Sequence, residues 1–350
     1  MNITDVARRA GVSISTVSRV LNEGDYPVKP ETRQKVLEAI EELRFRPNDL
    51  ARSLLLKQSR TIGLIIPDIS NPYYPELSLG VEATASGHGY AVIFCNTSRR
   101  VEKVEYYIDV LLQKRADGII IAGGGTDLAQ VSEAALGFDT KIALVGRHNL
   151  PFPSVQVDNF SAAREATSHL LDLGHRQIAF ISGPPTLTSV QDRLSGYKAS
   201  LEERGISEDD SLICDGDFEA ESGYSATLAL LQGKPRPTAI FAANDRMAIS
   251  AMAAAADLGL HVPDDLTVIG FDDIVTASLV RPALTTVALP AYEMGASAMR
   301  LMLRLLEGEE CPKIVWLTTE LVVRQSSGPP PRAEKIDERI QERRWSTDCP

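Results

Sequence analysis

The stretch ITDVARRAGVSISTVSRVLN, residues 3–22, contains two short helical patterns separated by Gly11. Thr4 is placed to cap the first helix, with Ile3 before it as a hydrophobic staple, and Ser13 is placed to cap the second. Apolar residues recur at helical spacing on one face of each pattern: Val6, Ala7 and Ala10, then Val17, Val20 and Leu21. The sequence therefore predicts two helices joined by a tight turn.

The outward face of the second predicted helix carries short hydroxyls, an amide and one arginine, with no acid: Ser15, Ser18, Arg19 and Asn22, with Ile14 exposed at its start. An arginine can make a forked contact to guanine, a serine can bond either base type, and an isoleucine can pack on a thymine methyl. This arrangement is the helix-turn-helix of DNA-binding proteins. The pattern alone fits an ordinary helical hairpin with a solvated polar face equally well.

The segments VSISTVSRVLN and ITDVARRAG resemble the N-terminal signature of the lactose/galactose-repressor (LacI/GalR) family. The resemblance continues through PETRQKVLEAIEELRFRPNDLARSL and on to about Gly328, so that it covers nearly the whole chain. It implies a DNA-binding head. We expect DNA contacts from Thr4, Ser13, Ile14, Ser15, Thr16, Ser18, Arg19, Asn22, Asn48, Ala51 and Leu54.

The distribution of charge favours DNA binding although the net charge does not. The chain has 350 residues and a net charge of −11, which alone argues against a nucleic-acid partner. Residues 1–60 hold 11 Lys and Arg against 8 Asp and Glu, a net +3, so the remaining 290 residues carry −14. A weakly basic head on an acidic body can approach DNA head first, because phosphate repels the body.

A third helix is expected from Pro30, a favoured first helical residue, and its apolar stripe completes a three-helix head. The following segment, PNDLARSLLLKQSRT, carries leucines beside basic residues, unlike a polar flexible linker. Asn48 can cap a short helix there, too short to be stable alone. We interpret it as a hinge that folds on DNA, and the resemblance implies that Leu54 enters the minor groove. The alternative is that these leucines pack on the body.

From Thr61 onward apolar strands alternate with amphipathic helices. Candidate strands are 62–68, 90–96, 118–123, 141–146 and 154–159, then 177–183, a weaker one near LICDGD, 238–245, 266–273 and 285–289. Such alternation predicts parallel sheets covered on both faces, and two runs suggest two doubly wound lobes. The resemblance implies a periplasmic-binding-protein-like α/β body with crossovers near 157–162, 287–292 and 318–325.

In such sheets ligands bind beyond the carboxyl ends of the strands, where this chain places Asp, Asn, Arg and aromatic residues. That mixture suits a small polyhydroxylated ligand. The resemblance implies ligand contacts by Arg193, Asn244, Asp272, Phe218 and Tyr73, and we add Tyr74, Arg147 and Ser189 to the candidates. Taken singly, Asp272 or Asn244 could merely cap the next helix, and Arg193 could pair with an acid.

Departures from the family pattern bear on the ligand. Gly146 and Arg147 stand where several sugar and purine repressors use an acid and an aromatic residue. Leu187 stands where the purine-binding branch uses an arginine. These differences argue against a purine and leave a sugar, or a related polyol or nucleoside, as the expected effector.

Motifs for catalysis or metal binding are not found. IAGGGTD fits neither common phosphate-binding glycine motif, and no HExxH or GxSxG is present. Cys95, Cys214, Cys311 and Cys349 are scattered without a CxxC pair, so neither a disulfide framework nor a zinc site is indicated. His175 is interpreted as structural. We expect no enzyme activity, metal or cofactor.

The predicted organisation is an all-α helix-turn-helix head (1–46), a hinge (47–59), a two-lobed effector-binding and dimerisation domain (60–327) and a tail (328–350). Ile336 and Ile340 suggest a short charged helix in the tail, and a tetramer is left open. The expected function is a cytoplasmic homodimeric repressor that binds a pseudo-palindromic operator under control of a small-molecule effector. The alternatives are a regulator that answers to a protein corepressor and a solute-binding protein; the polar N-terminus, without a signal peptide, argues against the latter.

Overall fold

The chain folds into two units, Met1–Arg60 and Thr61–Pro350. The computed structural model describes residues 2–22, 28–45, 58–123, 140–148 and 150–331. The predicted contacts Asn48, Ala51 and Leu54 lie outside the described residues, as do the tail helix and Cys349.

The first unit is the expected three-helix head, made of α1 (Ile3–Ala10), α2 (Ile14–Asn22) and α3 (Pro30–Glu42). Its core contains one valine from α1, two from α2 and one from α3: Val6, Val17, Val20 and Val36. Pro30 opens α3 as predicted.

The predicted cap of α1 is wrong. Asn2 precedes the helix, its Oδ1 accepts the backbone N–H of Asp5 at 3.1 Å, and the Asp5 carboxylate accepts the N–H of Asn2 at 2.9 Å. This reciprocal box satisfies two helix-end donors at once, whereas Thr4 lies inside the helix on its exposed surface.

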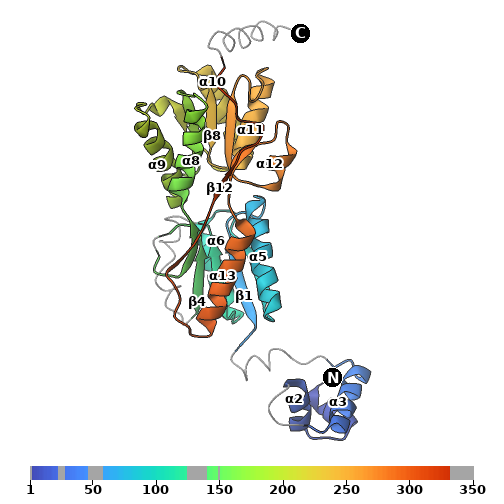
Figure 1. Ribbon diagram of the computed structural model, residues 1–350. Coiled ribbons are helices and arrows are strands. Elements are labelled where there is room, and N and C mark those ends of the chain that lie inside the picture. Colours follow the sequence, from blue (N-terminus) through green and yellow to red (C-terminus); the bar gives the residue numbers. More distant parts are fainter. Residues whose placement is uncertain (1, 23–27, 46–57, 124–139, 149, 332–350) are drawn as a thin grey trace. The chain divides into compact units, whose positions relative to one another are not determined.

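Two six-stranded sheets form the body (Figure 1). The first has the order β11-β5-β4-β3-β1-β2 and the second the order β12-β10-β9-β8-β6-β7. All neighbours are parallel except β12, which is antiparallel to β10. The strands are β1 (Thr61–Ile66), β2 (Ala91–Asn96), β3 (Gly118–Ala122), β4 (Lys141–Val145), β5 (Ser154–Val157), β6 (Ile178–Ile181), β7 (Ile213–Cys214), β8 (Ala239–Ala242), β9 (Thr267–Asp272), β10 (Thr285–Ala288), β11 (Ile314–Leu317) and β12 (Glu320–Val322).

Helices cover these sheets and define two lobes. In the first lobe α5 and α13 pack on one face of the sheet, and α6 packs on the other. In the second lobe α8 packs beside α9, and α10 beside α11. The body's helices are α5 (Tyr73–Gly87), α6 (Val101–Gln113), α8 (Asn159–Asp172), α9 (Thr188–Glu203), η2 (Asp210–Leu212), α10 (Ala220–Gln232), α11 (Asp245–Asp257), α12 (Val275–Leu279) and α13 (Ala291–Leu306). This confirms the predicted α/β body of two doubly wound lobes.

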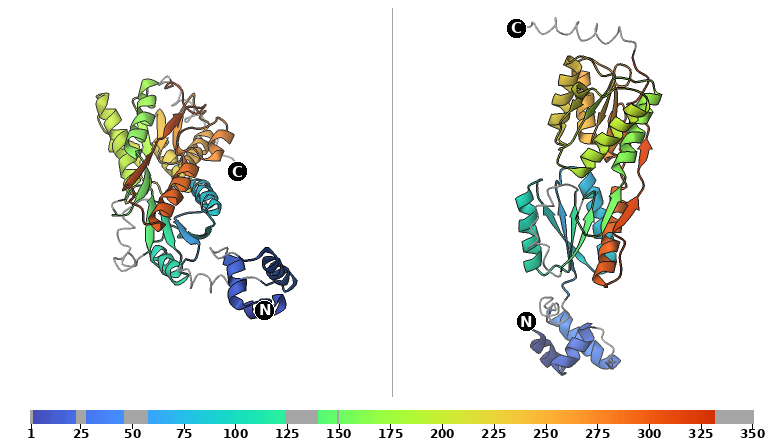
Figure 2. Two further views of the ribbon diagram at one scale, coloured as in Figure 1. Left: turned by 60° about the horizontal axis from the view of Figure 1, so that its bottom comes forward. Right: turned by 90° about the vertical axis from the view of Figure 1, so that its left-hand side faces the viewer.

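The described chain crosses between the lobes at three places. Residues 157–159 join β5 to α8, residues 288–291 join β10 to α13, and residues 317–320 join β11 to β12. Figure 2 shows the two lobes joined by these segments. The crossovers fall where the family resemblance placed them. The strand β11 was not predicted, because KIVWL is short and alternates exposed with half-buried residues instead of forming a continuous buried run.

In the first lobe the backbones of α5 and α13 meet without intervening side chains. A Cβ added at Gly80 would collide with the carbonyl oxygen of Tyr292, and one at Gly295 would collide with that of Leu77. Glycine allows this approach, so the two helices lie side by side as a single layer over the sheet (Figure 1).

Candidate DNA-binding face and ligand cavity

The turn between α1 and α2 sets the direction of the second helix. Gly11 adopts the left-handed conformation (φ 66°) that ends α1. Ser13 then caps α2 as predicted, because its Oγ accepts the backbone N–H of Thr16 at 3.2 Å. The Ser13 hydroxyl also lies 2.7 Å from that of Ser15 and 2.8 Å from that of Thr16. The N-terminal end of α2 therefore presents a connected group of hydroxyls.

The outward surface of α2 has the predicted composition. Ile14 is 47% exposed, Ser15 and Arg19 are exposed, and Thr16 and Ser18 are half-buried. Asn22 ends the helix, and its side chain lies outside the described atoms. A fixed helix face that combines an exposed isoleucine, a hydroxyl and a guanidinium can contact the edges of bases in the major groove.

A cavity of about 280 Å³ lies in the body, at the carboxyl ends of strands from both lobes. Seven of the eight predicted effector residues line it: Tyr73, Tyr74, Arg147, Ser189, Arg193, Phe218 and Asp272. Gly123 also lines the cavity, whereas residues 124–126, which follow it on the same predicted loop, lie outside the described chain. The strand-end argument thus located the cavity.

Asn244 is the exception. Its Oδ1 accepts the backbone N–H of Met247 at 2.9 Å and so caps α11, while its Nδ2 donates to the carbonyl oxygen of Phe218 at 3.0 Å. It is not among the described lining residues. Both polar atoms of the side chain thus have a partner within the protein, and the ligand contact at Asn244 stays a prediction.

Arg193 is the central charged group of the second-lobe wall. Its side chain is 8% exposed, and its guanidinium carbon lies 3.6 Å from the centroid of the Phe271 ring. Nε donates to the Asn159 side chain at 2.9 Å, and Nη1 donates to the carbonyl oxygen of Ala243 at 2.5 Å. Nη1 is 3.9 Å from Asp272 Oδ1. These contacts fix the guanidinium in place.

Asp272 lies beside Arg193 in the cavity wall and is 8% exposed. Burial raises the pKa of its carboxyl to about 7, although the charges of Arg193 and Arg99 act in the opposite direction. Asp272 has φ 119°, a left-handed backbone that L residues rarely adopt. A strained, buried carboxyl at a strand end is typical of a binding position.

The aromatic and remaining charged candidates come from both lobes. Tyr73 and Tyr74 open α5, with ring centroids 5.0 Å apart in an edge-on arrangement. Burial raises the pKa of both phenols well above the usual value, so both stay neutral. Arg147 follows β4 and is paired with Asp192 of α9 in the other lobe, with Nε and Oδ2 3.1 Å apart.

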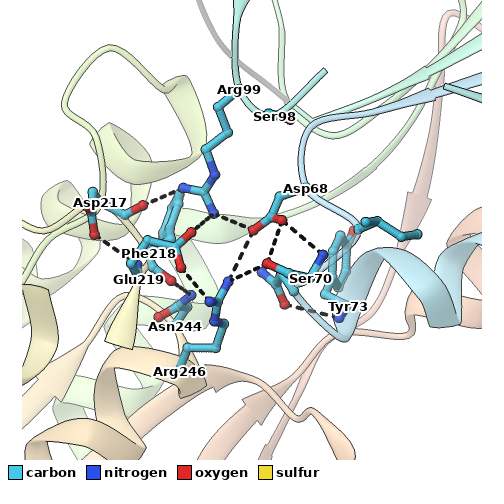
Figure 3. Close-up of polar contacts among 12 residues, drawn as sticks. Asp68, Ser70, Tyr73, Ser98, Arg99, Asp217, Phe218, Glu219, Asn244 and Arg246 are labelled. Atoms are coloured by element: carbon cyan, nitrogen blue, oxygen red, sulfur yellow. Dashed lines mark hydrogen bonds and ion pairs between the residues drawn. The ribbon is translucent and has the colours of Figure 1, made fainter. Parts of the chain in front are cut away.

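Four charged residues form a ring between the lobes, which we call the charge ring: Asp68, Arg99, Glu219 and Arg246. Asp68 and Arg99 belong to the first lobe, and Glu219 and Arg246 to the second. Each carboxylate contacts both arginines. Asp68 lies 3.4 Å from Arg99 and 3.1 Å from Arg246, Glu219 lies 3.5 Å from Arg99, and Arg246 donates to Glu219. Figure 3 shows the alternating contacts.

Further contacts tie the charge ring to the cavity. Arg99 lines the cavity, donates to the carbonyl oxygen of Asp217 and lies over the Phe218 ring at 5.4 Å (Figure 3). Burial acts to raise the pKa of Asp68, but hydrogen bonds from Ser70 and the charges of Arg99 and Arg246 outweigh it, so the pKa is lowered. The charge ring therefore joins the lobes through ion pairs that are continuous with the cavity wall.

Sequence reasoning missed the charge ring. Asp68 and Glu219 stand near predicted strand ends, but nothing in the sequence pairs them with Arg99 or Arg246, which come from other segments. His175 has the structural role expected of it: it is fully buried, with Nδ1 2.8 Å from Thr238 Oγ1 and Nε2 2.9 Å from the Gly328 carbonyl oxygen.

Within the described residues we find no group of three or more His, Cys, Asp or Glu side chains able to hold a metal ion. No helix in the same part of the chain has both the length and the apolar character needed to cross a membrane.

Comparison with known proteins gives matches over both units. Residues 2–48 match the family of bacterial regulatory proteins, lacI family, and residues 167–327 match the periplasmic binding protein-like domain. Over 334 residues the chain is 42% identical to catabolite control protein A of Priestia megaterium, covering 93% of this chain and 100% of that protein. It is 40% identical over 326 residues to the ribose operon repressor of Halalkalibacterium halodurans, covering 93% and 96%. A solved Lac repressor dimer, bound to operator and the anti-inducer ONPF, superposes with a TM-score of 0.86 at 31% identity, covering 94% of this chain and 99% of that one.

Proposed function

Because the chain belongs to the LacI family of bacterial regulatory proteins, we propose that it represses genes of sugar, carbohydrate or nucleoside metabolism in the cytoplasm under control of a small hydroxylated effector. The observation that carries the proposal is the fixed outward face of α2, with Ile14, Ser15 and Arg19 exposed on a folded head. The ribose operon repressor among its relatives supports a sugar-related role. The mechanism needs binding and conformational change, and no catalytic step of its own.

We propose that the protein acts as a homodimer on a pseudo-palindromic operator, because a two-fold protein matches a two-fold site. Support comes from large apolar side chains that are exposed on elements of both lobes. Leu79 on α5 is 57% exposed, Phe94 on β2 49%, and Leu279 on α12 64%. Figures 1 and 2 show α5 and α12 on the same side. Exposed apolar side chains that gather on one surface are typical of a subunit interface.

The effector is proposed to bind in the cavity, where Arg193 and Asp272 would hold its hydroxyls and the tyrosines would pack against its ring. Charge-assisted hydrogen bonds give such a site its orientation. The cavity has walls from both lobes, so a ligand with different affinities for two lobe arrangements shifts the balance between them. Because the body begins at Thr61, this shift would change the starting point of the hinge that precedes it.

The proposal is tested on the hinge. Leu54 is proposed to enter the minor groove at the operator centre, so Leu54→Ala should weaken operator binding while leaving effector affinity unchanged. The operator is first obtained by selection from random duplexes, and affinities are then measured by fluorescence anisotropy and calorimetry. The matched control is Leu55→Ala, which should reduce operator affinity less than Leu54→Ala does. Equal operator affinity for wild type and Leu54→Ala would contradict the insertion of Leu54 into the minor groove. Failure to select any duplex would contradict the function itself.

A further inference from the structure

A second pocket, of about 390 Å³, lies at the crossovers, and it shares no described lining residue with the cavity between the lobes. We call it the crossover pocket. One face of α8 and the segment that joins β11 to β12 line it: Asp158, Ser161, Ala162 and Glu165, then Trp316, Leu317, Thr318 and Thr319. The crossover pocket therefore takes its walls from two of the three crossovers, residues 157–159 and 317–320.

The α8 wall of the crossover pocket has a carboxylate at each end. Its four lining residues stand at positions i, i+3, i+4 and i+7, which lie on one face of a helix. Asp158 and Glu165 are two helical turns apart, which is about 10 Å along the axis. Ala162, small and buried, lies between them. This wall thus offers two negative charges separated by a short apolar stretch.

Both carboxylates are accessible to a ligand, since both side chains are exposed. The backbone N–H and the hydroxyl of Ser161 donate to Asp158 at 3.0 and 2.7 Å and lower the pKa of its carboxyl, so Asp158 is ionised. An ionised carboxylate can accept further hydrogen bonds. Arg147 also acts on Asp158, but Arg147 is itself paired with Asp192.

Trp316 of β11 distinguishes the crossover pocket from an ordinary solvated helix face. Val315 and Leu317, its neighbours in the strand, pack against the first-lobe core, so the indole points to the other face of the sheet. There it lines the pocket and is 53% exposed. The face of a tryptophan ring attracts cations such as ammonium groups. The pocket thus combines an aromatic wall with two carboxylates from a different element.

This combination selects one class of ligand. An anion would be repelled, and carboxylates about 10 Å apart cannot share one metal ion. A linear molecule with an ammonium at each end can pair with both carboxylates, because nine single bonds in extended form span about 10 Å. Each ammonium has three donors, and the hydroxyls of Ser161, Thr318 and Thr319 are further acceptors in the same pocket.

We propose that the crossover pocket binds a linear aliphatic diamine, with one ammonium at Asp158, the other at Glu165 and the methylene chain against Trp316. This site is additional to the proposed operator and effector sites. Because two crossovers line it, a diamine that prefers one lobe arrangement shifts the balance between arrangements. The protein would then respond to a second, positively charged small molecule.

The test follows the fluorescence of Trp316. The chain has two tryptophans, Trp316 and Trp345, so Trp345→Phe in the full-length protein leaves Trp316 as the reporter. It is titrated at constant ionic strength with α,ω-diaminooctane and with octylamine, which has the same chain and one charge. The diamine should change the fluorescence saturably and bind about 2-fold to 5-fold more tightly than octylamine, as expected for one further exposed ion pair.

Variants locate the two ends of the diamine and its chain. Glu165→Gln should abolish the advantage of the diamine over octylamine, whereas Glu202→Gln, at an exposed position of α9 outside the pocket lining, should keep it. Trp316→Leu, measured by calorimetry, should weaken diamine binding by about 2-fold to 5-fold, and Trp316→Phe should retain part of it. Thermal melting verifies that each variant is folded.

Different failures identify different errors. Equal affinity for diaminooctane and octylamine would overturn the pairing with two carboxylates. An equal fluorescence response to Mg²⁺ at the same ionic strength would mean adventitious cation binding only and would overturn the site. Distances between spin labels on the two lobes that do not change with the diamine would overturn the coupling to the lobe arrangement. Operator binding is measured separately, so none of these results decides the proposed function.

Discussion

Arg193 shows at the scale of one residue how a binding group is prepared in advance. Asn159, Ala243 and Phe271 hold its guanidinium before any ligand arrives. Little side-chain entropy is then lost on binding, and the position of the charge is set by the protein. The neighbouring Asp272 differs from Arg193, because its carboxyl changes charge near neutral pH.

Asp272 should make stability depend on pH. The folded protein keeps its proton up to about pH 7, whereas the unfolded chain releases it near the ordinary value of 3.8. Unfolding therefore releases a proton between these values, and the free energy of unfolding falls as the pH rises. The free energy of unfolding of Asp272→Asn should fall less over the same pH range. The gap between the free energies of unfolding of variant and wild type should change by at most about 1.4 kcal/mol per pH unit.

Urea unfolding from pH 4 to pH 8 measures this effect. The difference between wild type and variant is needed because other groups titrate too: burial lowers the pKa of His148 to about 4, which raises stability with pH over part of the range. Asp215→Asn, an exposed position outside the cavity, is the control. A constant difference between wild type and Asp272→Asn across the range would contradict the prediction.

Arg19 is expected to read one base pair. Removing its guanidinium in Arg19→Ala should relax sequence preference at a single operator position, by about 1–3 kcal/mol. Anisotropy measured against operators with each base substituted in turn gives the preference at every position. A uniform loss over all sequences would instead mean that Arg19 contacts only phosphate.

Sequence predicted the residues of the cavity well, because polar and aromatic residues at strand ends share one edge of a parallel sheet. At Asn244 the amide caps α11, the alternative that the sequence left open, and its ligand contact stays a prediction. The predicted cap at Thr4 was wrong, although the spacing of Asn2 and Asp5 was a readable signal for the capping box.

At the scale of elements, the contact between α5 and α13 depends on glycine. Gly295→Ala places a methyl group against the Leu77 carbonyl oxygen, so the helices must separate. Overpacking of this kind should lower the free energy of unfolding by about 1–3 kcal/mol. Thermal melting and urea unfolding measure the loss.

The control for this change is Gly87→Ala, near the end of α5. Nothing lies within 4 Å of the added methyl group there, and the backbone is helical. Alanine should leave stability unchanged or raise it slightly, by about 0.4–1 kcal/mol. If both variants behave alike, close helix approach is not the reason for Gly295.

Strands were predictable where they are buried on both faces, as in β1, β3 and β4. The edge strand β11 was not, because its pairing with β5 depends on a distant segment that the local sequence does not specify. The charge ring was even less predictable from the local sequence, because its four side chains come from four segments of two lobes.

At the scale of the whole molecule, the charge ring should favour the lobe arrangement seen here. Arg246→Gln leaves Asp68 and Glu219 with Arg99 as their shared partner in the charge ring. The stability of this lobe arrangement relative to others should therefore fall by about 1–2 kcal/mol. Distances between spin labels on the two lobes, introduced in a cysteine-free background, would then broaden toward longer values.

Arg164→Gln is the matched control, because Arg164 pairs with Glu203 at a site where both side chains are about half exposed. Such a pair contributes little, about 0–1 kcal/mol. An unchanged distance distribution in Arg246→Gln would contradict the prediction that the charge ring favours this lobe arrangement.

The three crossovers also have a consequence for synthesis. The head needs only the first 45 residues, whereas neither sheet is complete until residues 314–322 have left the ribosome. At ordinary translation rates that interval lasts on the order of tens of seconds. A nascent chain thus carries a finished head on an unfinished body, and a message truncated before codon 314 would yield a head without a complete effector-binding body.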